Sequence, residues 1–318
     1  MNKCFITKLP SSVDNDNLPV LGQLRINWLK QSNLTDNDAR AIGLSTNDSI
    51  TIKVSGAHLT DSTLASNLGN TKTITAADGV VWLYVSNDAD AVLTIDNKYS
   101  LTYLSFVRRP NRSGLKKSAK FDINDIRYCT ALTTLDLSNT QVSGDISAVS
   151  QLTALTFLGL SNTQVSGDIS AVSKLTALTY LNLTNTQVSG KIDSLANLTK
   201  LTNLNEFKGL SLTGDMSKIP AGVNIISLNN RKVNTNFTWT ANGRKNATLL
   251  AMSGSVPFDT ASMDNMLVDQ ATCTFKPNDS MPWTKTISVS GTRTSASDAA
   301  VATLQNMGVT ITGVTKQD

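Results

Sequence analysis

The chain of 318 residues is nearly devoid of histidine and glutamate, since His58 and Glu206 are the only examples of each. A single histidine excludes every catalytic mechanism that needs a pair of imidazoles. Three cysteines, Cys4, Cys129 and Cys273, are odd in number and far apart in the chain. They predict neither a disulfide framework nor a metal site. We interpret Cys129 and Cys273 as small core residues.

Long hydrophobic runs are also absent. No segment approaches the ~20 apolar residues of a membrane helix, and the start MNKCFITKLPSSVDNDNLPVL has no apolar stretch of signal-peptide length. We therefore expect no transmembrane segment and no Sec signal. Charged residues make up 16% of the chain, with a net charge of +4. This balance argues against a disordered acidic tail and against a nucleic-acid partner.

Motifs of the common enzymes are missing as well. The sequence has no GxSxG, no HExxH, no glycine loop of the kind that cradles phosphate, and no clear carboxylate pair. We expect a protein that is not an enzyme and that has no cofactor and no metal. A polysaccharide-directed hydrolase in a flanking region stays open as an alternative, because two-carboxylate chemistry needs no histidine.

What the sequence does contain is an internal repeat. The pattern LTxLxL begins at Leu132, Leu155, Leu178 and Leu201, always 23 residues apart, and an earlier copy begins at Leu101. Leucines that alternate predict a short strand, and the apolar residues that follow recur every three or four positions, as in a 3₁₀ or helical segment. One such unit cannot bury its leucines alone, whereas stacked units bury them in a continuous core.

The units LTTLDLSNTQVSGDI, LTFLGLSNTQVSGDI and LTYLNLTNTQVSGKI resemble leucine-rich repeats of the bacterial, internalin-like class. The resemblance implies an α/β solenoid with a parallel sheet on its concave face and a short 3₁₀, helical or irregular convex side. The asparagine of the family's ladder is replaced by Thr140, Thr163 and Thr186, and we expect a weaker ladder for this reason.

We divide the chain into a β-rich N-terminal region or cap (residues 1–100), the leucine-rich repeats (101–230), and degenerate repeats with a C-terminal cap (231–318). The first region has strand-like runs at 24–29, 49–55, 80–86 and 91–96 and a helical pattern at 36–42 that would end at Gly43. In the last region, residues 286–312 read as strand, helix and strand, with Ser297 as the helix cap.

Sequence variation is concentrated on one face of the predicted strands. Residues Ser138–Ser150 are identical to Ser161–Ser173, whereas the positions between inward leucines differ from unit to unit. Those positions face away from the core, so we predict a ligand-binding concave face with exposed ring faces at Phe157 and Tyr180. Its predicted contact residues are Tyr103, Phe157, Tyr180, Asn182, Asn203, Asn205 and Phe207, with Tyr103 and Phe207 in columns adjacent to the aromatic pair.

A basic segment, RRPNRSGLKKSAK, lies where the first unit is longer than the others. We interpret it as a solvated loop or as a contact for anions or an acidic partner; the residues concerned are Arg108, Arg109, Arg112, Lys116 and Lys117. Asp145 and Asp168 share a column and are expected to be solvated at the outer edge, with a weak cation site as the alternative.

The main hypothesis is a non-enzymatic recognition or adhesion module that binds a protein or a glycan on its concave face. Three alternatives stay open: a binding protein of a phage or secretion particle, the hydrolase described above, and a purely architectural protein. The compartment is unknown, and the cell surface or a virion-like particle is the expected location.

Overall fold

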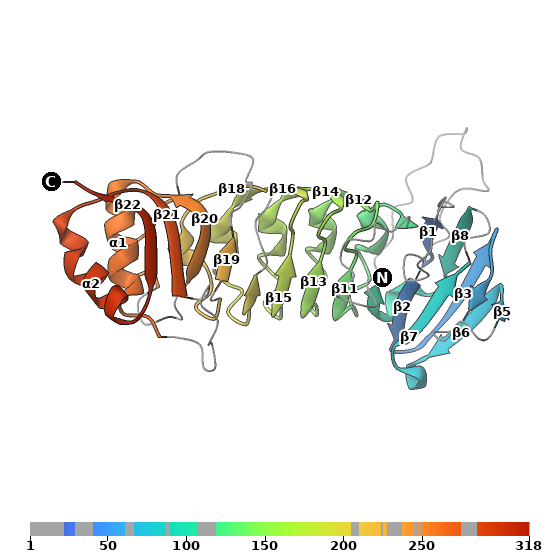
Figure 1. Ribbon diagram of the computed structural model, residues 1–318. Coiled ribbons are helices and arrows are strands. Elements are labelled where there is room, and N and C mark those ends of the chain that lie inside the picture. The colour runs from blue at the N-terminus through green and yellow to red at the C-terminus, as the bar shows by residue number, and fades with distance from the viewer. Residues whose placement is uncertain are drawn as a thin grey trace, which may run out of the picture.

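The computed structural model describes residues 22–28, 41–60, 67–86, 90–106, 119–204, 210–223, 225–227, 237–244, 247, 250–274 and 285–317. These residues form an elongated stack, with antiparallel strands at the N-terminal end and two helices at the C-terminal end (Figure 1). The repeat strands lie side by side between the two ends.

The outer sheet of the N-terminal end is antiparallel and has five strands. Alternate residues are buried, as Leu24, Ile26 and Trp28 show on β1. The strands predicted at 24–29, 49–55, 80–86 and 91–96 are confirmed within two residues. In sheet order the strands are β10 (Ala119–Lys120), β1 (Leu24–Trp28), β8 (Ala91–Ile95), β3 (Ser49–Ser55) and β6 (Thr71–Thr75).

A second sheet runs from the repeats into the N-terminal end without a break. Its repeat strands are parallel, and β2 pairs antiparallel with both β9 and β7 at the junction. In sheet order the nine strands are β17 (Asn203–Leu204), β15 (Tyr180–Asn182), β13 (Phe157–Gly159), β11 (Thr134–Asp136), β9 (Leu101–Ser105), β2 (Ala41–Thr46), β7 (Val81–Val85), β4 (Leu59–Thr60) and β5 (Asn67–Gly69).

Strand β2 corrects the helix predicted at 36–42. Ala41 and Ile42 are strand residues, residues 36–40 lie outside the described part of the chain, and Gly43 lies inside the strand. A Cβ atom at Gly43 would be 2.8 Å from the indole ring of Trp82. The glycine therefore makes room for a neighbouring strand's side chain, and pairing with β7 and β9 decided the local structure.

Each repeat coil continues into a second strand and a 3₁₀ helix. The second strands form a parallel sheet of four, β12 (Ser143–Asp145), β14 (Gln164–Asp168), β16 (Gln187–Lys191) and β18 (Ser211–Thr213). The 3₁₀ helices of the stack are η6 (Ile123–Ile126), η7 (Ile146–Val149), η8 (Ile169–Val172), η9 (Ile192–Leu195) and η10 (Met216–Lys218). The inward positions predicted for one coil are 0% exposed: Leu135, Leu137, Val142, Ile146, Val149 and Leu152.

Asp145 and Asp168 cap the 3₁₀ helices of their coils. The carboxylate of each accepts a hydrogen bond of 2.8 Å from the backbone amide two residues later, and this bonding lowers the pKa of Asp168. Gly167 in the following coil has φ +104°, and its Cβ would be 2.8 Å from the Asp145 carboxylate. The glycine column is thus needed both for its backbone conformation and for the space beside each cap.

Side chains form hydrogen-bonded ladders between successive coils at two positions. Neither position is the threonine column of Thr140, Thr163 and Thr186, where the sequence predicted a weaker ladder. Asn162 Nδ2 donates to Asn139 Oδ1 at 2.9 Å, and Thr156 Oγ1 donates to the carbonyl oxygen of Thr133 at 3.0 Å. Thr163 instead bonds within its own coil, to the carbonyl oxygen of Leu160 at 2.7 Å. Inter-coil bonding is therefore supplied by the neighbouring asparagine column and by the exposed threonine row.

The C-terminal end is a parallel sheet of four strands with two helices. The strand–helix–strand order predicted for 286–312 is confirmed, whereas helix α1 was not predicted. Ser297 precedes the second helix but does not cap it, because its hydroxyl donates to Asp264. The elements are β19 (Ile225–Ser227), β20 (Ala251–Pro257), α1 (Thr260–Gln270), β21 (Thr286–Arg293), η12 (Ser295–Ser297), α2 (Asp298–Asn306) and β22 (Thr310–Lys316), while η3 (Ala76–Asp78) and η4 (Lys98–Ser100) lie in the N-terminal part.

Candidate functional site

The outward side chains of β9, β11, β13, β15 and β17 form the surface that we call the repeat face. Strand register places its residues in two columns that cross the strands. The first column is Tyr103, Thr134, Phe157, Tyr180 and Asn203, and the second is Ser105, Asp136, Gly159 and Asn182.

Phe157 and Tyr180 stack face to face in the first column. Their ring centroids are 4.1 Å apart and their planes differ by 4°, because residues in register on parallel strands lie only ~4.8 Å apart. Both side chains are half-buried. The expectation of freely exposed ring faces is therefore wrong for the two inner faces, which cover each other.

Tyr103 lies in the same column as this pair, not in an adjacent one. Its ring meets the indole of Trp82 edge-on, with centroids 6.4 Å apart and planes at 75°. Trp82 comes from β7, which lies in the same sheet and is separated from β9 by β2. The repeat period gave no signal for Trp82, because its strand lies outside the repeats.

Asp136 is the charged member of the repeat face among the described residues. It is half-buried, and its Oδ1 accepts a hydrogen bond of 3.1 Å from the backbone amide of Ser138. Burial raises the pKa of Asp136 and outweighs the hydrogen bonds from Ser138. Burial also raises the pKa of Tyr103, and the negative charge of Asp136 adds to that shift. Asp136 is not among the predicted contact residues, which are aromatic residues and asparagines.

Replacement of Asp136 by asparagine is expected to leave the protein at least as stable as the parent at pH 7. The folded-state pKa of Asp136 is raised, so ionisation disfavours the folded state at pH values above it. This disadvantage disappears as the pH falls below the unfolded-state value of ~3.9. Urea unfolding at pH 7 and pH 3.5 measures the difference in free energy of unfolding between the parent and the variant. A variant clearly less stable than the parent at pH 7 would contradict the expected sign of this difference.

The other predicted contact residues divide into two groups. Asn182 and Asn203 lie on the repeat face, where Asn182 Oδ1 accepts from the backbone amide of Thr184 at 3.1 Å and Asn203 Oδ1 accepts from the hydroxyl of Thr202 at 2.9 Å. The rest lie outside the described residues: Asn205, Phe207, Arg108, Arg109, Arg112, Lys116 and Lys117.

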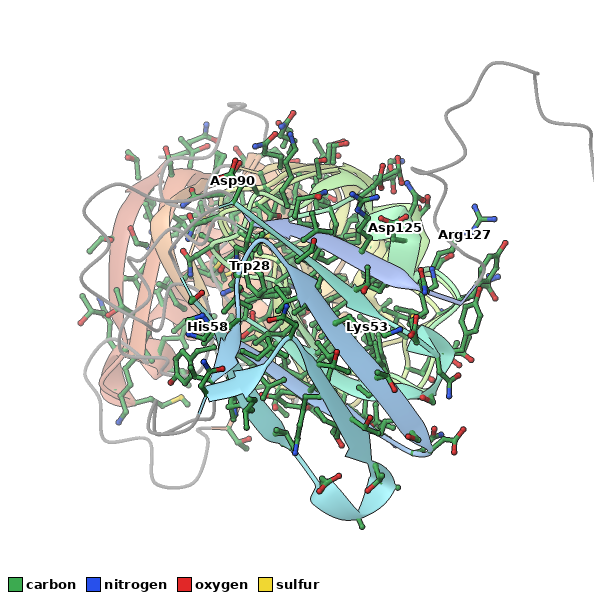
Figure 2. The ribbon with its side chains drawn as sticks, turned by 90° about the vertical axis from the view of Figure 1, so that its right-hand side faces the viewer. Trp28, Lys53, His58, Asp90, Asp125 and Arg127 are labelled. Carbon is green, nitrogen blue, oxygen red and sulfur yellow. The ribbon has the colours of Figure 1, made fainter. Side chains whose placement is uncertain are left out.

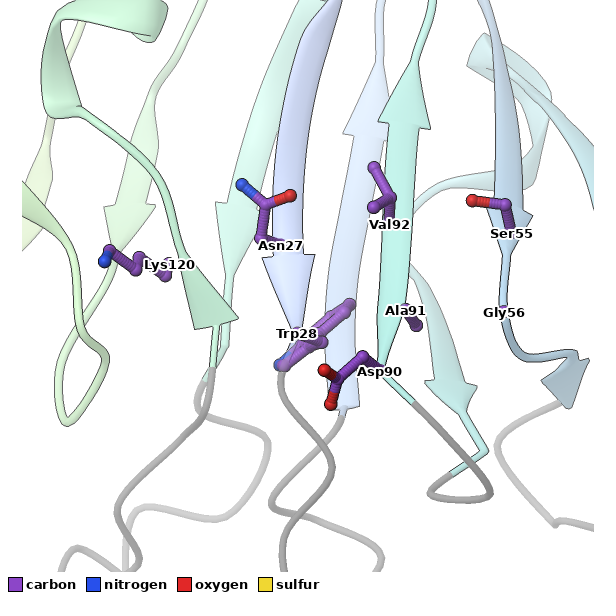
Figure 3. Close-up of a pocket in the computed structure, with 8 residues that line it drawn as sticks. All are labelled: Asn27, Trp28, Ser55, Gly56, Asp90, Ala91, Val92 and Lys120. Carbon is purple, nitrogen blue, oxygen red and sulfur yellow. The ribbon is translucent and has the colours of Figure 1, made fainter. Parts of the chain in front are cut away.

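A pocket of about 450 Å³ lies on the five-stranded sheet of the N-terminal end, away from the repeat face (Figure 3). Its volume is in the range of small-molecule sites. The lining combines an acid, a base, an amide and apolar side chains, and consists of Asn27, Trp28, Ser55, Gly56, Asp90, Ala91, Val92 and Lys120. These residues come from separate strands without a shared motif, which explains why the sequence did not indicate the pocket.

Reactive side chains are not gathered into one centre in the part of the chain that the structure describes. His58 stands apart from the carboxylates of Asp90 and Asp125 when the molecule is viewed from its N-terminal end (Figure 2). Cys129 and Cys273 are buried, as predicted, and burial raises their pKa to about 12 and about 11. No group of three metal-binding side chains occurs among the described residues.

Comparison with known families identifies the repeat units. Residues 153–197 match the family model "Leucine Rich repeats (2 copies)". These residues are therefore similar to two leucine-rich repeats. The matched residues contain β13 and β15, which carry Phe157 and Tyr180 on the repeat face, and β14 and β16 of the second parallel sheet.

Several solved structures are similar to parts of the chain. The BIR2 ectodomain from Arabidopsis thaliana is 27% identical, with a TM-score of 0.29 over 34% of this chain and 58% of that one. The leucine-rich-repeat ectodomain of the receptor kinase SOBIR1, from the same organism, is 25% identical, with a TM-score of 0.32 over 36% and 65% of the two chains. The Leptospira interrogans LRR protein LIC12759 is 15% identical, with a TM-score of 0.39 over 61% and 46%.

The matched regions span less than two thirds of each of these structures. No curated protein matches the chain at a significant level. Among the described residues, no helix is both long and apolar enough to cross a membrane.

Proposed function

We propose that the protein is a non-enzymatic recognition module that binds a macromolecular partner on its repeat face. The observation that carries the proposal is the stacked pair Phe157 and Tyr180, which stands on the face where the repeats differ from each other. Aromatic side chains offer a large contact area with few rotamers to fix, and they are common at the centres of binding surfaces.

The surroundings of the pair support the same function. Amide, hydroxyl and carboxylate groups flank the rings in both columns, so the surface combines an apolar centre with polar groups that fix orientation. The core needs none of these side chains, because the inward leucines of the strands are fully buried without them. The side chains of the repeat face are therefore free to be selected for binding a partner, because the fold does not depend on them.

Finer features of the hypothesis are part of this proposal. The partner is a protein or a glycan, the repeats are of the internalin-like class from a bacterium, and the protein acts at a cell surface or on a virion-like particle. The three regions 1–100, 101–230 and 231–318 are proposed as cap, repeats and second cap.

The double variant Phe157→Ser with Tyr180→Ser is expected to bind its partner at least tenfold more weakly, which corresponds to ~1.4 kcal/mol. Loss of the stack should lower stability by only about 0.5–1.5 kcal/mol, and the fold should persist because both side chains lie outside the leucine core. The measurement is binding to hits from a random-peptide library and a glycan array, together with thermal unfolding.

Tyr128→Ser is the matched control, because Tyr128 is 54% exposed and lies outside the repeat face. A partner bound equally well by the double variant would refute the proposal. If Lys116→Ala with Lys117→Ala abolished that binding instead, the basic segment would be the site. Release of a shorter sugar from an array hit would support the hydrolase alternative.

A further inference from the structure

The negative charge of Asp136 is not required by the fold. Its hydrogen bonds come from Ser138, from the backbone amide at 3.1 Å and from the side chain. Two coils further along, Asn182 accepts the equivalent bond from the Thr184 amide at the same distance of 3.1 Å. An uncharged amide therefore accepts the backbone bond at this position too, so this bond does not account for the negative charge at 136.

Asp136 also has no counter-ion among the described residues. The groups that face it are Tyr103 and Ser105 on β9 and Phe157 and Gly159 on β13, none of which is a cation. The coil on one side is built to receive the carboxylate, since a Cβ atom at Gly159 would be 2.6 Å from Asp136 Oδ1. A desolvated carboxylate without a cation nearby is unfavourable. A partner that places a positive charge beside Asp136 would therefore gain binding free energy.

The first column has its smallest side chain beside this carboxylate. Thr134 lies between Tyr103 and Phe157, whose strands are two spacings apart, about 9.6 Å. A flat cation above Thr134 would lie between the two strands that carry these aromatic rings, one spacing of ~4.8 Å from each strand, where a cation–π interaction with the facing rings can form. The carboxylate of Asp136 lies two residues along the same strand and the same face.

From this geometry we propose that the repeat face receives one arginine side chain of a protein partner, above Thr134, between Tyr103 and Phe157 and paired with Asp136. This proposal rests on the proposed binding function of the repeat face. The guanidinium group is planar and can both stack on aromatic rings and pair with a carboxylate through two parallel hydrogen bonds. A lysine ammonium lacks the flat shape, and a bound metal would need further carboxylates, of which the described repeat face has none.

The test is selection from a random dodecapeptide library on the immobilised protein, followed by affinity measurements with synthetic copies of the selected peptides. We expect the peptides to share an arginine, and its replacement by citrulline to weaken binding at least tenfold. Citrulline keeps the size and planarity of the side chain but not its charge. Affinity should also fall as the pH is lowered from 7 towards 4, because protonation of Asp136 removes the partner charge.

Three variants separate charge from position. Asp136→Asn should weaken binding of the arginine peptide at least tenfold and abolish its preference over the citrulline peptide. Gly159→Ala keeps the charge but displaces the carboxylate, so it should also weaken binding. Asp145→Asn is the matched control, because Asp145 is an exposed cap outside the repeat face, and it should bind as the parent does.

Each remaining outcome overturns the arginine proposal in a different way. Peptides that need Phe157 and Tyr180 but tolerate citrulline and Asp136→Asn would leave the binding function in place and remove the arginine. Selection of lysine, or of neutral glycans that ignore Asp136, would do the same. If no selected peptide depends on the aromatic pair, the arginine proposal fails; the function itself fails only if array glycans also ignore that pair.

Discussion

Replacement of Leu158 by alanine is expected to lower the free energy of unfolding by about 2–5 kcal/mol, the usual effect of truncating a buried leucine. Leu158 is 0% exposed and lies in register with Leu135 and Leu181, so neighbouring coils pack on it from both sides. Coils stacked in register cannot close around the missing atoms without disturbing the strand pairing. The cavity should therefore persist.

Urea unfolding of the parent and the variant measures this difference. Gln164→Ala in the same coil is the control, because the Gln164 side chain is exposed and its loss should change stability by ~0.5 kcal/mol or less. A Leu158→Ala variant that unfolds like the control would show that the register of β13 is one residue away from that described, since such a shift reverses inward and outward side chains.

Replacement of Arg244 by methionine is expected to lower the free energy of unfolding by as much as Leu158→Ala does, or by more. Arg244 is 2% exposed, and its guanidinium group donates to the carbonyl oxygens of Ile219, Pro220 and Val223 at 2.6–2.8 Å. Methionine can fill much of the volume but leaves these buried acceptors without their donor, at about 1–3 kcal/mol for each group. We expect a loss of about 3 kcal/mol or more.

Arg127→Met is the control, since Arg127 is exposed and contacts the Tyr128 ring. The difference in stability between Arg244→Met and Arg127→Met measures the contribution of the buried hydrogen bonds. Arg244→Lys should fall between parent and Arg244→Met, because an ammonium group can reach fewer carbonyl oxygens at once. Thermal and urea unfolding of the three variants provide the comparison. Equal stability of Arg244→Met and Arg127→Met would mean that the carbonyl oxygens of residues 219–223 find other donors.

The sequence predicted what is local and periodic. The spacing of 23 residues identified the inward leucines, and the interpretation of Cys129 as a core residue is confirmed. These inferences succeed because each coil pairs only with its neighbours. The same pattern located the columns of the repeat face, which became a candidate site once the side chains between the leucines were compared.

Features that depend on distant pairing were not accessible in this way. Residues 41–42 read as the end of a helix, yet β2 pairs with β9 some sixty residues later in the chain, and pairing of this kind outweighs local propensity. Trp82 enters the repeat face through that junction. The stack of Phe157 on Tyr180 and the bond that makes Asn182 equivalent to Asp136 needed side-chain positions, which no period supplies.

The ladders between coils have a consequence for how such a molecule can change its length. The bond from Asn162 to Asn139 recurs between Asn185 and Asn162, and the bond from Thr156 to Thr133 recurs between Thr179 and Thr156. Each of these coils thus presents to the next coil the same hydrogen-bond acceptors to which it is itself bonded in the preceding coil. In-frame duplication or loss of one 23-residue unit would leave both ends intact and change their separation by one strand spacing, ~4.8 Å. Gain or loss of whole units would therefore change the distance between the two ends of the stack in steps of equal size.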